Sequence, residues 1–181
     1  MLISLTKKES GGYLATARIE AGAVEVLVAE TDHDHTLPHE LSHIAIEGCL
    51  SLDWGFWGCV SRGALFDGMK ILNGRDEDAA AEISAAVRAD AGARFYKAEI
   101  MVAAVEDSYP DGHIKDAEEC RALAGRSYED LRKEILAVDF SEIAEQLGAL
   151  VDEWASLPPG GTLSREWVTP RNPLDFTVDP V

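Results

Sequence analysis

The first thirty residues partly alternate between apolar and polar side chains, the pattern that predicts β-strands buried on one face. Residues favoured in strands are concentrated in Tyr13–Ile19 and Val24–Val28. Gly11-Gly12 supplies a turn between the first two apolar segments. We therefore expect three short strands, joined by tight turns into an antiparallel meander, at residues 2–6, 13–20 and 23–30.

From residue 37 onward, apolar positions recur with the spacing of a helix face. Asp76 is a suitable N-cap for the longest of these segments, and Gly92 is a point at which that helix can bend. The glycines at 58, 63 and 68 weaken the helical pattern of the second segment. The expected helices cover residues 37–50, 55–72, 76–107, 115–124, 128–138 and 141–156.

The prolines and glycines at 158–161 end the last helix. Beyond it we expect an extended tail over residues 157–181, packed across the body or onto a neighbouring subunit. A length of 181 residues suits one domain with a buried core. The sequence thus predicts a single α+β domain over 1–181, with a small N-terminal antiparallel sheet of about three strands in residues 1–30 and a mostly helical body in residues 37–156.

Acidic residues outnumber basic ones by 33 to 16, which gives a formal net charge of −17 at pH 7. A field of that sign repels phosphate backbones and anionic lipids, so we expect neither nucleic acid nor a membrane surface as a partner. No apolar run is long enough for a transmembrane helix, and the N-terminus lacks the features of a signal peptide. A cytoplasmic location is therefore expected, with the cysteines as buried thiols.

The clearest chemical signal is the histidine-rich stretch at residues 31–52, which holds four of the five histidines of the chain. Within it, residues 39–43 read HELSH, an HExxH pattern. Each residue of a helix advances by about 100°, so His39 and His43 lie together on a narrow polar stripe of an otherwise apolar helix. Two imidazoles placed in this way can bind one metal ion, and the glutamate beside the first can accept a proton from water.

This pattern resembles the motif of the zincin metallopeptidases in five of the 181 residues. The resemblance implies a bound zinc ion, with His39 and His43 as ligands, Glu40 as the general base, and a peptide or small-molecule amide as substrate. A small sheet ahead of the motif helix is also similar to the zincin arrangement. The match ends there, because Ile46 and Cys49 replace the glycine and third histidine of the metzincins, and the second glutamate motif of the gluzincins is not found.

The motif does not fix the third zinc ligand, for which we consider three residues. Glu47 lies on the same polar stripe, but it is about 12 Å from His39 along a straight helix, which is too far for easy joint ligation. It can instead form a hydrogen bond to His43. His35, in the loop before the helix, can fold back onto the site more easily. Glu99 is the best-placed residue on a later helix for a gluzincin-like ligand.

The segment Asp53–Gly58 reads DWGFWG and places three aromatic residues directly after the motif helix. They can form the wall of a pocket over the site or a core corner between two helices. Together with Leu37–His43, this segment resembles an LPH[DE]xxH…GFWG arrangement in short bacterial proteins, which implies no particular activity. That resemblance does imply that aspartate can stand at the position of Glu40.

The function that we predict is zinc-dependent hydrolysis of a peptide or amide bond. The alternative is a non-catalytic helical accessory or interaction protein, in which the polar stripe is structural, and a homodimer is compatible with either function. The two differ in their sites. An enzyme needs a third ligand and an open position for water, whereas a closed network in which each imidazole bonds a carboxylate favours the structural role.

Overall fold

The computed structural model describes residues 1–19, 23–109 and 117–169. Within these residues the sheet has five strands in the order β4-β3-β2-β1-β5, and all neighbouring strands are antiparallel. The strands are β1 (Leu2–Lys7), β2 (Tyr13–Ile19), β3 (Val24–Thr31), β4 (Lys70–Asn73) and β5 (Thr162–Glu166). The α+β class is confirmed. The expected sheet of about three N-terminal strands is wrong, because β4 lies between helices and β5 comes from the tail.

Alternating burial explains why the first strands form where the sequence predicts them. Ile3 and Leu5 of β1 are fully buried, whereas the residues between and beside them are more exposed. Gly12 has a φ of 76°, and a Cβ at this position would overlap the backbone of Thr31, so the turn before β2 requires glycine. The last strand, β5, pairs with the free edge of β1 and places Leu163 opposite Leu5. The core face of the sheet therefore continues into the tail.

The motif helix forms as expected, but two other expected helices do not. The helix expected over 55–72 ends at Ser61, because Gly63 and Gly68 have φ values of 98° and 87° and the chain then enters β4. The helix expected over 76–107 begins after its Asp76 cap, as predicted, and breaks at Gly92, where φ is 50°. The helices are α1 (His39–Cys49), α2 (Phe56–Ser61), α3 (Glu77–Ala91), α4 (Ala93–Asp107), α5 (Ala117–Ser127), η3 (Glu129–Leu131), α6 (Arg132–Leu136) and α7 (Phe140–Ser156).

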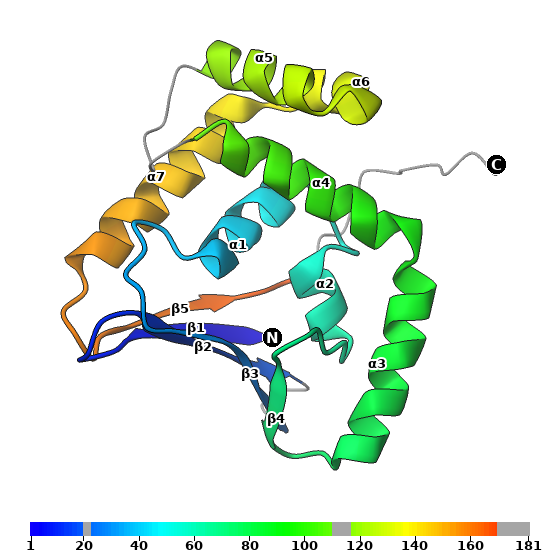
Figure 1. Ribbon diagram of the computed structural model, residues 1–181, viewed down its shortest axis with the longest axis vertical. Helices are drawn as coiled ribbons and strands as arrows, with labels where there is room; N and C mark the ends of the chain where they lie inside the picture. Colours follow the sequence, from blue (N-terminus) through cyan, green and yellow to red (C-terminus); the bar gives the residue numbers. More distant parts are fainter. Residues whose placement is uncertain (20–22, 110–116, 170–181) are drawn as a thin grey trace.

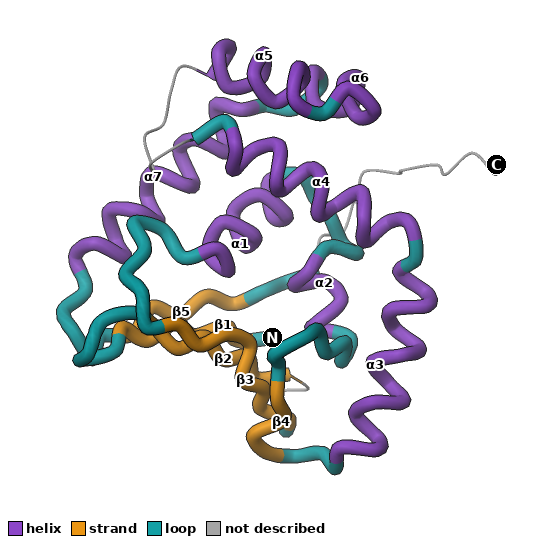
Figure 2. Tube along the Cα trace, viewed as in Figure 1, coloured by secondary structure: helices purple, strands orange, loops and turns teal. Residues whose placement is uncertain are grey.

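The helices lie on one side of the sheet, and α1 lies between the sheet and the pair formed by α4 and α7 (Figure 1). The same arrangement can be followed along the chain trace in Figure 2. Leu41 and Ile46 of α1 are fully buried in a hydrophobic core shared with the sheet, α4 and α7. Trp57 of α2 is fully buried in the same core. Because apolar side chains surround α1, its polar stripe is held in one orientation.

The segment expected as an extended tail packs on the sheet as far as the structure describes it. After β5, the backbone N–H of Trp167 donates to the carbonyl of Met1 at 2.8 Å. Residues 170–181 of that segment lie outside the described residues. Of the helices in the described ranges, none is both long and apolar enough to cross a membrane.

Candidate functional site

The motif helix α1 begins directly after Pro38, whose φ of −57° and ψ of 137° place it at the N-cap. His39 and His43 follow on one face, one turn apart. Their rings are nearly perpendicular, at 85°, with centroids 4.4 Å apart and Nε2 atoms 3.0 Å apart. The side chain of His43 is 2% exposed and that of His39 is 60% exposed. The two imidazoles therefore meet as the HExxH spacing predicts, one buried and the other open to solvent.

A carboxylate lies behind each imidazole. The Nδ1 atom of His43 is 2.7 Å from Oε1 of Glu47, and the Nδ1 atom of His39 is 3.0 Å from Oε1 of Glu106 on α4. Carboxylates in this position fix the orientation of the ring and make the opposite nitrogen a better metal ligand. Glu47, His43, His39 and Glu106 form a row joined by three hydrogen-bond contacts. Each contact needs one proton between its two atoms, so one proton lies between the two Nε2 atoms. Their separation of 3.0 Å suits a shared proton and is close to the spacing of two nitrogen ligands on one metal ion.

Glu47 is fully buried, and the first turn of α2 holds its carboxylate. Its Oε2 atom accepts a hydrogen bond from the backbone N–H of Trp57 at 3.1 Å, and the N–H groups of Phe56 and Gly58 contribute further bonds. Burial outweighs these bonds and raises the pKa of Glu47 to about 8. A Cβ at Gly55 would overlap the carboxylate. The GFWG segment (residues 55–58) therefore binds the carboxylate of Glu47, and its first residue, Gly55, must lack a side chain to leave room for that carboxylate.

The two imidazoles have opposite pKa shifts. Burial, together with repulsion from His39, lowers the pKa of His43 to about 4. The hydrogen bond to Glu106 raises the pKa of His39. Burial acts to raise the pKa of Glu106, but the hydrogen bonds from His39 and Ser42 outweigh it and lower that pKa. His43 is therefore neutral at pH 7, the state in which an imidazole binds a metal ion, and of the two imidazoles His39 keeps its added proton to the higher pH.

Glu40, the expected general base, is buried between α1 and the sheet. Its Oε2 atom accepts a hydrogen bond from the hydroxyl of Tyr13 on β2 at 2.6 Å. Its backbone carbonyl accepts a second bond from the indole N–H of Trp57 at 2.9 Å. Burial and the bond to Glu40 raise the pKa of Tyr13 above its ordinary value, so this hydroxyl stays protonated and donates. Tyr13 thus orients the carboxylate of Glu40 through one of its two oxygens.

Glu99 on α4 lies close to His43 and Glu47. A ring nitrogen of His43 and carboxylate oxygens of Glu47 and Glu99 lie within 4.8 Å of one another. Among the described residues, the buried Oε1 atom of Glu99 has no hydrogen-bond partner. Burial raises the pKa of Glu99, although the nearby histidine charges act to lower it. A buried carboxylate oxygen without a donor is costly, and a bound cation would remove that cost.

These groups face a pocket of about 340 Å³, which we call the Glu99 pocket. Its apolar lining consists of Val28, Ala29, Phe56, Phe66, Met69 and Phe95. Its polar lining consists of His39, Glu40, His43, Glu99 and Asp67. The side chains of Glu40, Glu47, Glu99 and Glu106 surround the two imidazoles. Burial raises the pKa of Glu47 and of Glu99, and a divalent cation beside them would favour their ionised forms.

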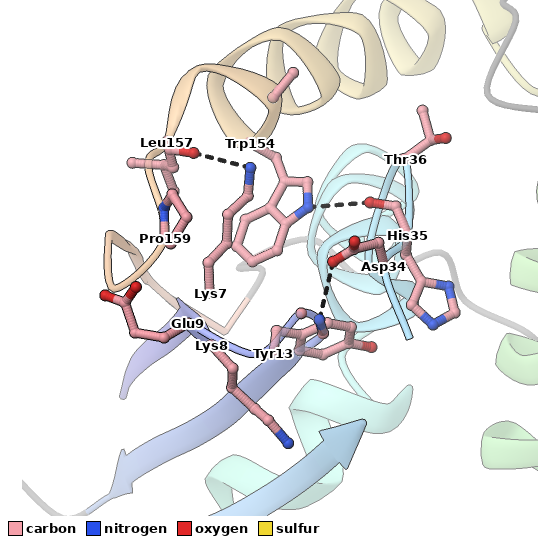
Figure 3. Close-up of a pocket in the computed structure, with 13 residues that line it drawn as sticks. Lys7, Lys8, Glu9, Tyr13, Asp34, His35, Thr36, Trp154, Leu157 and Pro159 are labelled. Atoms are coloured by element: carbon pink, nitrogen blue, oxygen red, sulfur yellow. Dashed lines mark hydrogen bonds between the residues drawn. The ribbon is translucent and has the colours of Figure 1, made fainter. Parts of the chain in front are cut away.

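His35, the candidate from the preceding loop, lies in a different pocket (Figure 3). Its ring meets that of Tyr13 edge-on, with centroids 5.7 Å apart, and its carbonyl accepts a hydrogen bond from the indole N–H of Trp154 at 3.1 Å. We call this space of about 570 Å³ the Trp154 pocket, and Lys7 and Asp34 also line it. His35 is absent from the lining of the Glu99 pocket. The structure therefore does not bring this histidine to the HExxH pair.

Two residues at the site were missed in the sequence, Glu106 and Tyr13. Glu106 comes seven residues after Glu99, a spacing that places both on one face of a helix and could have pointed to it. Tyr13 carries no local signal, because its bond to Glu40 joins residues that are 27 positions apart. Glu47, the ligand candidate on the motif helix, lies in the group with His43 and Glu99, and hydrogen bonds engage both of its oxygens.

No protein-family model matches the chain, no curated protein matches it, and no solved structure matches it. These comparisons neither support nor oppose the resemblance of residues 39–43 to the zincin motif. The site itself offers two imidazole nitrogens, a buried carboxylate oxygen without a partner among the described residues, and an oriented glutamate, all at one pocket.

Proposed function

We propose that the protein is a zinc-dependent hydrolase that cleaves a peptide or amide bond. The observation that carries the proposal is the pair of Nε2 atoms 3.0 Å apart, with a carboxylate behind each imidazole. Two nitrogen ligands of a tetrahedral zinc ion lie roughly 3.3 Å apart, given zinc–nitrogen bonds of about 2.0–2.1 Å. The two imidazoles are therefore close to the separation that one shared ion requires.

The ligands in this proposal are Nε2 of His39, Nε2 of His43 and a carboxylate oxygen of Glu99. Two imidazoles and one carboxylate form a ligand set of catalytic zinc sites, and Glu99, which lies close to His43 and has an oxygen without a partner among the described residues, takes the third place in this proposal. Glu47 and Glu106 would act through the histidines by holding their Nδ1 atoms. When bound, zinc supplies a Lewis acid that lowers the pKa of water and polarises a carbonyl group.

Glu40 is the proposed general base. It accepts a proton from the attacking water while the water oxygen bonds to the carbonyl carbon, and it delivers a proton to the amide nitrogen as the C–N bond breaks. The hydroxyl of Tyr13 holds one oxygen of Glu40 and so limits rotation of the carboxylate. The exposed imidazole of His39 leaves this end of the pocket open to a substrate.

A purely structural network is the competing explanation. Both imidazoles do bond a carboxylate, as such a network requires. A structural role does not explain why, among the described residues, a buried oxygen of Glu99 has no partner. It also does not explain a pocket directly beside the two imidazoles and Glu40. A metal-dependent enzyme accounts for both features.

The test is hydrolysis of a set of N-acetylated peptides by the zinc-loaded protein, with Glu40→Gln as the matched variant. We expect turnover by the wild type and turnover lower by about 10²–10⁴-fold in the variant, with an unchanged zinc content. Turnover that survives Glu40→Gln would contradict the role of the base. If zinc-loaded wild type cleaves none of the peptides, the hydrolase proposal is wrong.

A further inference from the structure

One side of the Glu99 pocket is a row of aromatic rings that begins at a proposed zinc ligand. The ring of Phe56 lies beside that of His43, with centroids 5.4 Å apart. Phe66 stacks on Phe56 with centroids 5.3 Å apart, and Phe95 stacks on Phe66 at 4.9 Å. The ring planes in these two pairs differ by 28° and 15°. The row therefore presents a continuous apolar surface that leads away from the ligand set.

This aromatic row is built from three separate parts of the chain. Phe56 begins α2, Phe66 lies between α2 and β4, and Phe95 belongs to α4. The backbone N–H of Phe66 donates to the sulfur of Met69 at 3.2 Å, and the Arg88 guanidinium lies 5.8 Å from the Phe66 ring. All three phenylalanines are only half-buried while lining the pocket. Neighbouring groups thus hold the row in place and leave it able to contact a ligand.

The rest of the apolar lining consists of Val28 and Ala29 of β3 together with Met69. The polar lining consists of the three proposed ligands, Glu40 and the exposed Asp67. Of the described residues that line this pocket, none is Lys or Arg. A negatively charged side chain would therefore find no Lys or Arg to pair with in this lining, whereas an uncharged aromatic ring would bury apolar surface.

We propose that the Glu99 pocket binds a large apolar side chain of the substrate, an aromatic one by preference, next to the bond that is cleaved. The identity of that bond rests on the proposed hydrolase function, whereas the binding preference rests on the aromatic row itself. The substrate class is then neutral peptides or amides in which phenylalanine, tyrosine, tryptophan or leucine flanks the scissile bond. The volume of about 340 Å³ is in the range of ligand pockets.

The test compares binding of N-acetyl-phenylalanine amide and N-acetyl-alanine amide to the zinc-loaded protein in an NMR titration. We expect the phenylalanine compound to bind at least about tenfold more tightly. Phe66→Ala should remove most of this difference. Tyr96→Ala is the matched control, because Tyr96 is another aromatic residue, on α4, but is 69% exposed and does not line the pocket. Equal affinities in the wild type would overturn the inference.

Ala29→Leu is a second variant that fills the pocket from β3 and keeps the aromatic row intact. It should also weaken binding of the phenylalanine compound, and circular dichroism will show that the variant is folded. Cleavage of peptides containing the same two side chains is measured in parallel. A binding preference without cleavage would support this inference and contradict the hydrolase proposal. Cleavage without a preference for phenylalanine would overturn this inference and support the hydrolase.

Discussion

The Glu99 pocket and the Trp154 pocket both border the histidine-rich stretch, yet their polar groups are arranged in opposite ways. In the Trp154 pocket, polar groups bond one another: the Lys7 ammonium donates to the carbonyl of Leu157, and the Trp154 indole donates to that of His35. In the Glu99 pocket, two imidazole nitrogens meet with carboxylates behind them. A buried oxygen of Glu99 has no partner among the described residues.

The proposed site thus rests neither on the size of the pocket nor on a nearby histidine alone. The Trp154 pocket is the larger, at about 570 Å³ against about 340 Å³. What distinguishes the smaller one is that its nitrogen and oxygen atoms are held in position and remain available to a ligand. Tyr13 belongs to both regions, with its ring beside Trp154 and its hydroxyl on Glu40.

Glu99→Gln should have the largest effect on the Glu99 pocket. Replacing a residue that hydrogen-bonds a metal ligand lowers the metal affinity by about 10–100-fold. Glu99 is itself a proposed ligand, so its replacement should lower the zinc affinity by more than about 100-fold. The matched variant is Glu47→Gln, which keeps the shape of the side chain behind His43. Its loss of zinc affinity should lie within the smaller range of about 10–100-fold. Competition with a chromophoric chelator measures both affinities. A larger loss for Glu47→Gln would assign the third ligand to Glu47.

Gly55→Ala tests the close packing of Gly55 against the Glu47 carboxylate. An added methyl group would overlap a fully buried carboxylate, so the free energy of unfolding should fall by about 1–3 kcal/mol. Gly48→Ala is the control, because a Cβ at this helical position would meet nothing within 4 Å. It should raise the free energy of unfolding by about 0.5–1 kcal/mol. If urea denaturation shows the two variants to be equally stable, Gly55 is not required for close packing.

Zinc affinity should fall as the pH falls. The bond to Glu106 raises the pKa of His39, so the proton between the two Nε2 atoms is retained to a higher pH than on a free imidazole. Zinc must displace this proton, which gives about a tenfold loss of affinity for each pH unit below the pKa of His39. The chelator competition, repeated over a pH series, measures this slope. An affinity independent of pH would show that no proton is displaced.

The part of the site that the sequence predicts is the part that one helix can form alone. His39 and His43 are four residues apart, and Glu47 is four residues further, so helical geometry fixes their order on α1 whatever the rest of the fold. Glu99 could be named only as a candidate, because its distance from α1 depends on how α4 packs. Tyr13 could not be found, because strand pairing and helix packing together bring it to Glu40.

The sheet shows the same limit. The first three strands follow from alternation and turn residues within the first thirty positions. β4 has only the residues Lys70–Asn73 in a glycine-containing segment, where the apolar spacing also suited a helix. β5 contains one large apolar residue, Leu163, and it is stabilised as a strand by pairing with β1 at the opposite end of the chain. From its own sequence, neither strand can be distinguished from helix or coil, because each is stabilised by pairing with a strand distant in the chain.

The most direct test of a shared ion between the two imidazoles is the zinc content per chain of untagged protein, compared with His39→Ala and His35→Ala. His39 is a proposed ligand with a largely exposed side chain, so its replacement should leave the fold intact. His35 comes from the same stretch but lies in the Trp154 pocket. We predict about one zinc ion per chain in the wild type and in His35→Ala, and loss of zinc in His39→Ala. Wild-type protein that binds no zinc after incubation with it, or zinc that persists in His39→Ala, would contradict the account.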